Sequence, residues 1–579
     1  MLTITTMSKC SSIKKTKDNL NKDKDINLFY QFFIHSNIER HKEITYCLRK
    51  NIENKHITKI YLLNERVYTL EEMGISSSIA SPLVSLAKNK IIQVITNIRL
   101  QYAHVFNYVT QNNIKGYIII NNADIFFNDT LQNLYVSTLH HEPINNNNNN
   151  NSSSSKQMFA QLRFEYNKED IAKSELFGPR TDSQDTWIFH SNNMIQSQFE
   201  KLFEFELGMP GCDNKIVYLM MILGYEVIND PYFIKTFHYH TTNIRNYTND
   251  NRIIPPYACI IPAGLSAKLH PRIDESLKLS FHDNNVLYNY VKNKINLNQN
   301  FIIPRISCFE NTFAVNIRLK NMPNNTHKKI QVNNWLNNPN VLQTMKNNAG
   351  IKMSNEQSFI HYSNSYLKAY ENCDLYGGWN IIEHVYSHSQ DYINEWYLTK
   401  RMFCSFAFDI FHYIHSSKNP WTLALKGKRI LIISAFEESI LEKLPNRDKI
   451  YGLELFPDCT FVTIKPPQTQ GDEPSDEYYI EADRFFKRLD KLKNKYDIAL
   501  VSCGGYGNMV CNYIYENHEK SAIYVGGVLQ MYFGILGNRW RRERYDIIKL
   551  FVDGNPYWSS PKESEKPKNH VNVEGSCYW

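Results

Sequence analysis

Short apolar runs alternate with amphipathic runs along most of the chain, and this order restricts the fold more than any other feature. In the first half, strand-like runs at residues 26–35, 57–64, 91–96 and 116–127 alternate with helix-like runs at residues 43–52 and 99–111. Parallel strands need long crossover connections, which are usually helices. The order therefore predicts a mainly parallel sheet with helices on both faces.

The same alternation returns after residue 301. Strand-like runs at residues 428–436, 459–467, 496–507 and 521–527 alternate with helix-like runs from about residue 438 and at residues 481–494 and 508–518. At 579 residues the chain is also too long for a single compact core. We therefore predict an α/β protein with two Rossmann-like domains in tandem, each with a mainly parallel sheet.

Four segments are expected. Residues 1–24 are polar and lysine-rich and are predicted to form a disordered tail. Residues 25–250 would form the first domain, residues 251–300 a connector with prolines and some helix, and residues 301–579 the second domain. Within the first domain, an asparagine run followed by serines predicts a disordered surface insertion at residues 144–156.

Composition excludes several classes of partner. Charged residues make up 21% of the chain, and the net charge of +7 is not gathered into a stripe, so no nucleic-acid partner is expected. No apolar run reaches the roughly 18–20 residues of a membrane span, and none follows the N-terminal lysines as a signal peptide would require. The 11 cysteines form no C-x-x-C pair, which favours reduced thiols and a cytoplasmic location.

Polar side chains follow successive predicted strands of the first domain. Asn122 and Asp124 come after one apolar run, where a carboxylate can either help to hold a divalent cation on a diphosphate or cap a turn. Asp213 begins an apolar helix, either as its N-cap or as a functional carboxylate. His238 and His240 share one face of a strand and either pack there or bind a ligand.

The loop at residues 178–189 adds a further polar cluster before a tryptophan-containing strand. Its members are Arg180, Asp182, Gln184 and Asp185. Ligands of open parallel sheets bind at the carboxyl ends of the strands. Polar clusters at several successive strand ends therefore indicate one ligand site.

Residues 26–250 resemble the GT-A type of nucleotide-sugar-dependent glycosyltransferase. Asn122-Ala123-Asp124 looks like the metal-binding D-x-D element, with Asn in place of its first Asp. Asp213 looks like the acidic residue beneath the acceptor, and His238 or His240 looks like the late histidine that completes the metal shell. The motif R-T-D-S-Q-D-T-W-I-F is similar to a segment of such enzymes from large viruses, algae and bacteria, which implies the host cytoplasm if the chain is viral.

This resemblance implies displacement at the anomeric carbon of a sugar nucleotide. A divalent metal, Mn²⁺ or Mg²⁺, and Arg99 or Arg180 would neutralise charge on the leaving diphosphate. Asp213, or alternatively Asp185, would take the proton of a glycan, lipid or protein acceptor, and Asp182 is a further catalytic candidate. A carboxylate base opposite the leaving group implies inversion.

Glycines mark two successive strand ends in the second domain: Gly504, Gly505 and Gly507 after one strand, Gly526 and Gly527 after the next. Such glycines let a backbone approach a phosphate, although tight turns also use them. Their spacing differs from G-x-G-x-x-G, which disfavours a dehydrogenase or a methyltransferase. Two such ends in succession predict a donor crevice.

Polar and aromatic residues beyond these glycines extend the predicted crevice. Gln530 and Arg539 would bind the donor there, and Trp540 could stack on a ring. Residues 304–579 resemble bacterial surface-glycan proteins related to the GT-D type of glycosyltransferase, whose R-x-G-D-G-E element binds metal. Arg305 and Glu310 match that element as donor and metal contacts, whereas Cys308 stands where its Asp would be.

The leading hypothesis is a tandem glycosyltransferase with one nucleotide-sugar site per half. One alternative has a single catalytic half. Another is a non-catalytic nucleotide- or glycan-binding protein, which the missing carboxylates at Asn122 and Cys308 favour.

Overall fold

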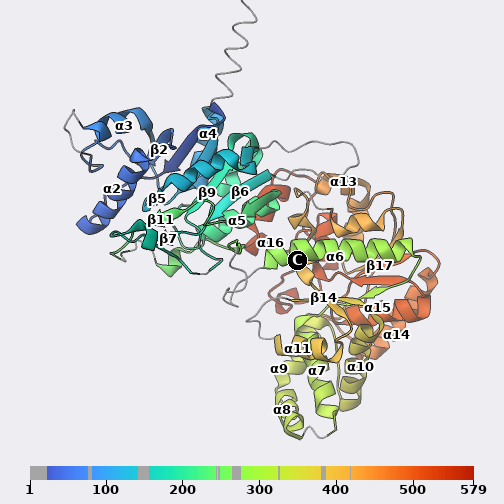
Figure 1. Ribbon diagram of the computed structural model, residues 1–579. Helices are drawn as coiled ribbons and strands as arrows, with labels where there is room; N and C mark the ends of the chain where they lie inside the picture. Colours follow the sequence, from blue (N-terminus) through green and yellow to red (C-terminus); the bar gives the residue numbers. More distant parts are fainter. Residues whose placement is uncertain are drawn as a thin grey trace, which may run out of the picture. The chain divides into compact units, whose positions relative to one another are not determined.

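The computed structural model describes residues 22–75, 81–140, 156–178, 180–242, 244, 248–263, 276–323, 326–379, 387–416 and 419–579. The chain forms an N-terminal unit, Met1–Glu275 with His415–Ser417, and a C-terminal unit, Ser276–Ile414 with Lys418–Trp579 (Figure 1). Residues 1–21 of the expected tail and residues 144–155 of the expected insertion lie outside the described residues.

The described part of the N-terminal unit is built on a seven-stranded sheet of order β10-β6-β9-β4-β1-β2-β3. Its strands are β1 (Ile26–Tyr30), β2 (Lys59–Asn64), β3 (Ile91–Ile95), β4 (Tyr117–Asn121), β6 (Lys156–Gln161), β9 (Thr186–His190) and β10 (Tyr225–Ile228). Neighbours pair in parallel except that β9 runs antiparallel to β4 and β6. The predicted mainly parallel α/β fold is confirmed.

Helices cover both faces of this sheet because its strands are apolar on both sides. They are α2 (Ile38–Glu53), α3 (Pro82–Lys90), α4 (Tyr102–Gln111) and α5 (Cys212–Ile222). Leu28 and Ile119 point to the cluster that contains Ile44 of α2. On the opposite face, Phe106 of α4 contacts Phe189 of β9.

A smaller sheet, of order β5-β11-β7-β8, adjoins the large one. Its strands are β5 (Ile125–Phe127), β7 (Phe164–Glu165), β8 (Glu175–Leu176) and β11 (Thr236–His238). The run predicted as one strand at residues 116–127 therefore divides into β4 and β5, and a turn in which the Ile125 N–H donates to the Asn122 carbonyl separates them. This turn places Asp124 where the two sheets meet. In the pairing of β11 with β5, His238 lies opposite Ile125 and thus beside Asp124.

The C-terminal unit contains a parallel five-stranded sheet of order β12-β18-β17-β15-β16 among the described residues. Its strands are β12 (Ile302–Ile303), β15 (Arg429–Ser434), β16 (Thr460–Ile464), β17 (Ile498–Ser502) and β18 (Ser521–Tyr524), and β13 (Leu375–Gly378) pairs in parallel with β14 (Arg401–Cys404). Ile430 and Ile432 enter one core cluster, while Leu431 and Ile433 enter another. Alternate residues of β15 thus bury both faces, as parallel sheets require.

The helices of this unit are α6 (Ser276–Asn296), α7 (Cys308–Asn321), α8 (Thr326–Leu336), α9 (Pro339–Ala349), α10 (Glu356–Asn372), α11 (Ser387–Trp396), α12 (Glu437–Lys443), α13 (Arg447–Ile450), α14 (Tyr478–Leu489), α15 (Gly507–Tyr513), α16 (Asn538–Glu543) and α17 (Tyr545–Ile547). All of α6 falls in residues 251–300, the segment expected to be a connector with some helix. Leu287 and Val291 of this helix are fully buried in the core of the unit, because its apolar face packs there.

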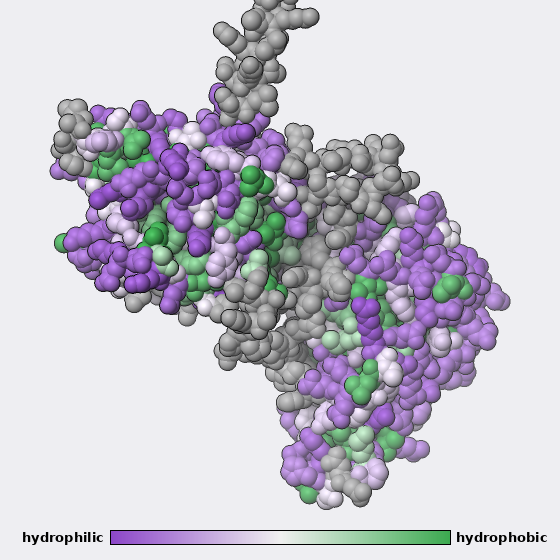
Figure 2. All heavy atoms as spheres, viewed as in Figure 1, coloured by the Kyte–Doolittle hydropathy of each residue, from purple (hydrophilic) through white to green (hydrophobic). Residues whose placement is uncertain are grey.

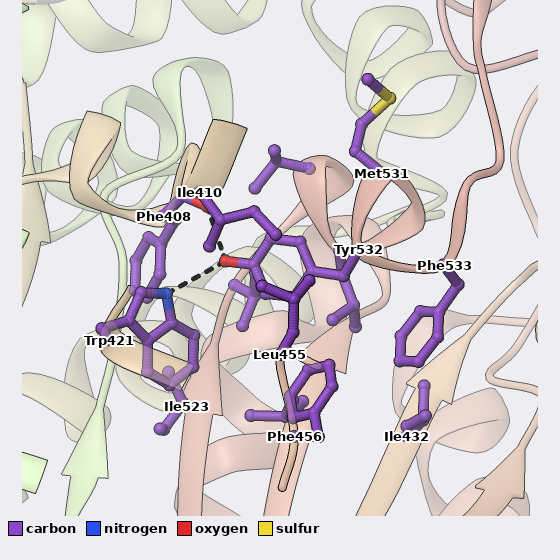
Figure 3. Packing of buried hydrophobic residues seen from close by; sticks show 14 of the residues in the cluster. Phe408, Ile410, Trp421, Ile432, Leu455, Phe456, Ile523, Met531, Tyr532 and Phe533 are labelled. Carbon is purple, nitrogen blue, oxygen red and sulfur yellow. Dashed lines mark hydrogen bonds between the residues drawn. The ribbon is translucent and has the colours of Figure 1, made fainter. Parts of the chain in front are cut away.

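Tyr532 provides a test of this core. Its hydroxyl donates to the Phe408 carbonyl at 2.5 Å and accepts from Trp421 Nε1 at 3.1 Å (Figure 3). Tyr532→Phe removes a partner from two buried polar groups and is expected to lower the free energy of unfolding by about 1–3 kcal/mol in urea titrations. The exposed Tyr545→Phe should change it by less than about 0.5 kcal/mol. Equal stability of the two variants would contradict the role of this hydrogen-bonded pair.

On the face that Figure 2 shows, hydrophilic residues cover most of the coloured surface of each unit, with small separate hydrophobic patches. Among the described helices, none has both the length and the apolar character that crossing a bilayer requires.

Candidate active site

Polar side chains from distant parts of the chain line one cavity of about 730 Å³ in the N-terminal unit. The sequence-predicted residues along it are Arg99, Asn122, Asp124, Arg180, Asp182, Gln184, Asp185, Asp213, His238 and His240. Its volume lies within the roughly 300–1,000 Å³ of small-molecule sites. The structure thus brings every site residue predicted for this half to one place.

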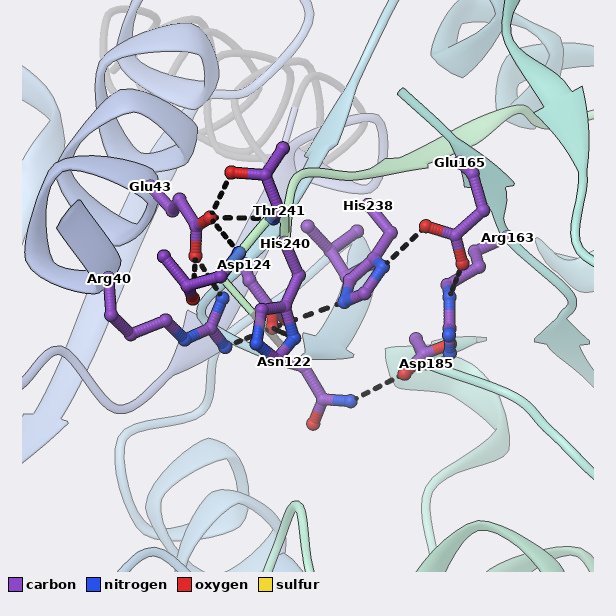
Figure 4. Close-up of polar contacts among 12 residues, drawn as sticks. Arg40, Glu43, Asn122, Asp124, Arg163, Glu165, Asp185, His238, His240 and Thr241 are labelled. Carbon is purple, nitrogen blue, oxygen red and sulfur yellow. Dashed lines mark hydrogen bonds and ion pairs between the residues drawn. The ribbon is translucent and has the colours of Figure 1, made fainter. Parts of the chain in front are cut away.

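Asp124 lies in a buried ionic network (Figure 4). Its Oδ2 accepts a hydrogen bond from Arg40 Nη2 at 2.5 Å and lies 3.3 Å from His238 Nε2 and 3.8 Å from His240 Nδ1. Burial alone raises the pKa of Asp124, but His238 and Arg40 outweigh burial and hold this pKa well below its usual range. Asp124 is therefore an ionised carboxylate at neutral pH.

In both histidines, the ring nitrogen farther from Asp124 also has a partner. His238 Nδ1 lies 2.9 Å from Glu165 Oε2, and His240 Nε2 lies 3.1 Å from the Ile244 carbonyl. Burial lowers the pKa of His238, but Asp124 and Glu165 outweigh burial and raise it to about 9. His238 therefore carries a proton toward Asp124 at neutral pH, and cation binding would have to release that proton.

The donor set of this cluster suits a divalent cation. The ligand atoms of Asp124, His238 and His240 lie within 4.8 Å of one another. Carboxylate oxygen and imidazole nitrogen are ordinary ligands of such ions, and a carboxylate such as Glu165 commonly orients a ligating histidine. Because Arg40 already contacts Asp124 Oδ2, a cation and Arg40 must compete for this carboxylate or share its oxygens.

Arg40 and Glu43, which stand one turn apart on α2, also belong to this site, although the sequence did not predict them. Glu43 accepts from Arg40 at 2.9 Å and from the N–H groups of Thr241 and Thr242 at 2.6 and 2.9 Å. It therefore ties α2 to the segment directly after His240. An Arg–Glu pair at this spacing is typical of any helix surface, so the sequence carried no signal for it.

Arg163 and Asp185 extend the network to Asn122. Asp185 accepts from Asn122 Nδ2 at 2.8 Å and from Arg163 Nη1 at 2.6 Å, and Arg163 also contacts Glu165 at 2.9 Å. A carboxylate at position 122 would face that of Asp185, whereas the amide donates to it. This contact gives a physical reason for Asn in place of Asp at the first position of the motif. Arg163 and Glu165 were likewise not predicted from the sequence.

Asp213 stands in the first turn of α5, whose N-cap is Gly211 with φ of 81°, so the N-cap alternative for Asp213 is wrong. Its carboxylate accepts from the N–H groups of Asn214 at 3.0 Å and Gln184 at 3.4 Å. Burial and then the charge of Asp185 raise the pKa of Asp213 to about 7. A carboxyl group with such a pKa can accept or donate a proton near neutral pH.

Arginines surround the same cavity: Arg40, Arg99, Arg163, Arg180 and Arg252. Arg180 binds both oxygens of Asp182, at 2.7 and 2.9 Å, and Arg99 lies 3.6 Å from Glu206. The Arg180 and Arg99 side chains are 39% and 37% exposed, so these ion pairs are weak and an anionic ligand can replace them.

The glycines predicted to bind a donor in the C-terminal unit lie against the protein itself. A Cβ atom added to any of them would come too close to a neighbouring atom. At Gly504 and Gly505 it would lie 3.0 Å from the Ala349 carbonyl and 2.4 Å from Ile351, and at Gly507 it would lie 2.2 Å from the Tyr524 ring. At Gly526 and Gly527 it would lie 1.9 Å from Arg305 Nη1 and 2.3 Å from the Tyr578 ring. Internal packing accounts for these glycines, and a donor-binding role for them stays a prediction.

The other residues predicted for this unit are engaged within it. Arg305 donates to the Val525 carbonyl at 2.8 Å, Gln530 donates to the Ile535 carbonyl at 3.1 Å, and Arg539 pairs with Glu574 at 2.7 Å. Trp540 is 6% exposed and belongs to the core, so the predicted stacking on a ligand is wrong.

Glu310, predicted as a metal ligand, stands in the first turn of α7. Burial raises the pKa of Glu310 to about 7. Among the described residues it belongs to no group of three or more side chains that could share an ion. Its metal role therefore stays a prediction.

No protein-family model matches the sequence, and no curated protein matches it. One solved structure that does match is the mannosyltransferase PcManGT from Pyrobaculum calidifontis, in complex with GDP-Man and Mn²⁺. The TM-score is 0.23 and the identity 13%, over 40% of this chain and 65% of the other. The chain thus covers less than two thirds of that protein, and so low a TM-score does not establish a shared fold.

Proposed function

We propose that the N-terminal unit transfers a sugar from a nucleotide-sugar donor to a hydroxyl group of an acceptor. The observation that carries this proposal is the single cavity lined by a cation-ligand group, several arginines and the carboxyl group of Asp213. Transfer from such a donor needs positive charge at the leaving diphosphate and a base near the acceptor.

The donor diphosphate would lie beside the cation-ligand group. Asp124, His238 and His240 would hold a divalent cation, Mn²⁺ or Mg²⁺, which supplies positive charge toward the leaving group. Arg99 and Arg180, released from their surface ion pairs, would bind the phosphate oxygens with charge-assisted hydrogen bonds.

Asp213 is the base in this proposal, because its pKa of about 7 suits proton transfer near neutral pH. Asp185 is held by Arg163, so we assign it to positioning, and Asp182 pairs with Arg180 until the donor phosphates replace it. Attack opposite the leaving group would invert the anomeric centre. Product stereochemistry tests this point, since a retained configuration would exclude Asp213 from the role.

For the C-terminal unit we propose that it is not a second catalytic half. Internal contacts of Arg305, Gln530 and the glycines, together with Cys308 in place of an acidic residue, support this choice. The acceptor remains a glycan, lipid or protein in our proposal.

Nucleotide release from a panel of UDP-, GDP-, CMP- and dTDP-sugars with Mn²⁺ tests the proposal on the full chain. We expect release from one donor class, abolished by Asp124→Ala and retained by Arg305→Ala. Donor binding without any release would support the non-catalytic alternative. Release lost only in Arg305→Ala would move the activity to the C-terminal unit.

A further inference from the structure

A second cavity, of about 510 Å³, lies in the C-terminal unit and takes no part in the proposed transfer. Side chains of α10, α14, α15 and the turn after α15 line it. We propose that this cavity binds pyranose rings of a neutral oligosaccharide. The proposal concerns binding alone and does not depend on catalysis in the N-terminal unit.

Aromatic rings form the apolar part of this cavity. Phe486 of α14 and Tyr513 of α15 stack with centroids 3.9 Å apart and an interplanar angle of 1°. Tyr479, also on the cavity wall, is 44% exposed, so its ring is accessible to a ligand. An accessible ring in a concave site offers a flat, electron-rich face, which suits the C–H face of a pyranose.

Amide side chains supply the polar part. Asn364, Asn512 and Asn517 line the cavity, and each amide can both donate and accept hydrogen bonds, as sugar hydroxyl groups also do. Asn512 is fixed by the Asn372 amide at 2.7 Å and by Glu516 at 3.0 Å. Polar groups held in place in this way reduce the entropy cost of binding.

The charge of the lining favours a neutral ligand. The lysine and carboxylate side chains that line it are Lys368, Asp483 and Glu516, which together carry a net charge of −1. Lys368 is also paired with Glu371 at 3.0 Å and Asp483 with Lys487 at 2.6 Å, and these two outer partners leave the net charge at −1. Phosphates and acidic sugars would meet an unfavourable potential here, in contrast to the arginine-lined cavity of the N-terminal unit.

The backbone beside the cavity is also unusual. Helix α15 passes directly into a π-helical turn, Ile514–His518, from which Glu516 and Asn517 face the cavity. Such turns are rare and occur frequently at functional sites. Asp490 accepts from the Tyr513 hydroxyl at 2.9 Å and lies 2.9 Å from His518 Nε2, which fixes the Tyr513 ring at the wall.

Calorimetric titration of the full chain with maltohexaose, cellohexaose, mannohexaose and chitohexaose tests the proposal. At least one of these sugars should bind, and Tyr479→Ala and Phe486→Ala should each weaken it roughly 5- to 10-fold through loss of ring stacking. Tyr479→Phe keeps the ring and should retain binding. Tyr545→Ala, an exposed tyrosine outside the cavity, and Asp124→Ala should leave the affinity unchanged.

Three results would overturn the proposal: no binding of any of these sugars, wild-type affinity in both the Tyr479→Ala and the Phe486→Ala variant, or tighter binding of a sulfated hexasaccharide than of its neutral parent. Circular dichroism of each variant separates loss of binding from loss of fold. Because Tyr479 is exposed, its replacement should leave the fold intact. Failure of nucleotide release would leave this result untouched, so the two proposals fail separately.

Discussion

Replacing Asp213 with Asn is expected to lower the turnover number for sugar transfer by about 10²–10⁴-fold, the usual contribution of a general base. The amide keeps the shape of the side chain, and its oxygen can still accept from the Asn214 N–H; its NH2 group cannot accept the longer bond from the Gln184 N–H, at 3.4 Å. Because neither bond involves the donor, donor affinity should change little. The measurement is transfer to the acceptor, or to water, with the donor that the panel identifies. Wild-type turnover in this variant would assign the base elsewhere.

The pH dependence gives an independent check on Asp213. A base must be deprotonated, so kcat/KM of the wild type should rise with pH and level off above about 7, and the residual rate of the Asn variant should lack this rise.

Stability should change in the opposite direction to activity. The folded-state pKa of Asp213 lies above the unfolded value of about 3.9, so the wild type loses stability as the pH rises from about 4 to 7. Asp213→Asn should therefore match the wild type near pH 4 and be more stable by roughly 1–4 kcal/mol at pH 8. A variant that is less stable at pH 8 would show that the amide disturbs the site, and its activity would then not report on the base.

The alternating pattern predicted the fold class because the spacing of apolar residues within each strand and helix shows which of its faces is buried. This spacing depends only on neighbouring residues, which explains the wrong predictions for residues 116–127 and for the glycines. The run at residues 116–127 is apolar at both ends, and only the Asn122–Asp124 turn, whose bonds depend on the second sheet, divides it. In a sequence, a glycine that gives a ligand room after a strand cannot be distinguished from one that gives room to a neighbouring side chain. Gly507 packs against the ring of Tyr524 and is therefore a packing glycine.

Site residues at strand ends could be predicted because topology alone brings such ends together. Arg40 could not, since it stands within a helix and its partner Asp124 lies 84 positions along the chain. Glu165 ends the two-residue strand β7, and Arg163 directly precedes this strand, which is too short to predict from sequence. The roles of the two residues follow from their contacts with His238 and Asp185. Such pairings depend on tertiary structure, which periodicity does not record.

Replacing Asp124 with Asn is expected to have the second large effect, on Mn²⁺ binding and therefore on nucleotide release. Asparagine is a neutral and weaker ligand, and it removes the only carboxylate of the described cation-ligand group. We expect Mn²⁺ affinity, measured by electron paramagnetic resonance without donor, to fall at least about 100-fold. Glu165→Gln leaves Asp124 in place but weakens the contacts of Glu165 with His238 and Arg163, and it should lower the affinity by about 10–100-fold.

Substitution of Arg40 distinguishes between two interpretations of this cluster, a cation site and a purely structural ion network. Its guanidinium contacts Asp124 Oδ2, the same carboxylate that a cation would use. Arg40→Gln removes this competing positive charge, so Mn²⁺ should bind more tightly in this variant, while Asp124→Asn should bind it more weakly. If Asp124 served only to neutralise Arg40 and His238, both substitutions would reduce stability and neither would change Mn²⁺ affinity. A cation site therefore predicts that Mn²⁺ affinity rises in Arg40→Gln and falls in Asp124→Asn. Wild-type Mn²⁺ affinity in Asp124→Asn would exclude such a site.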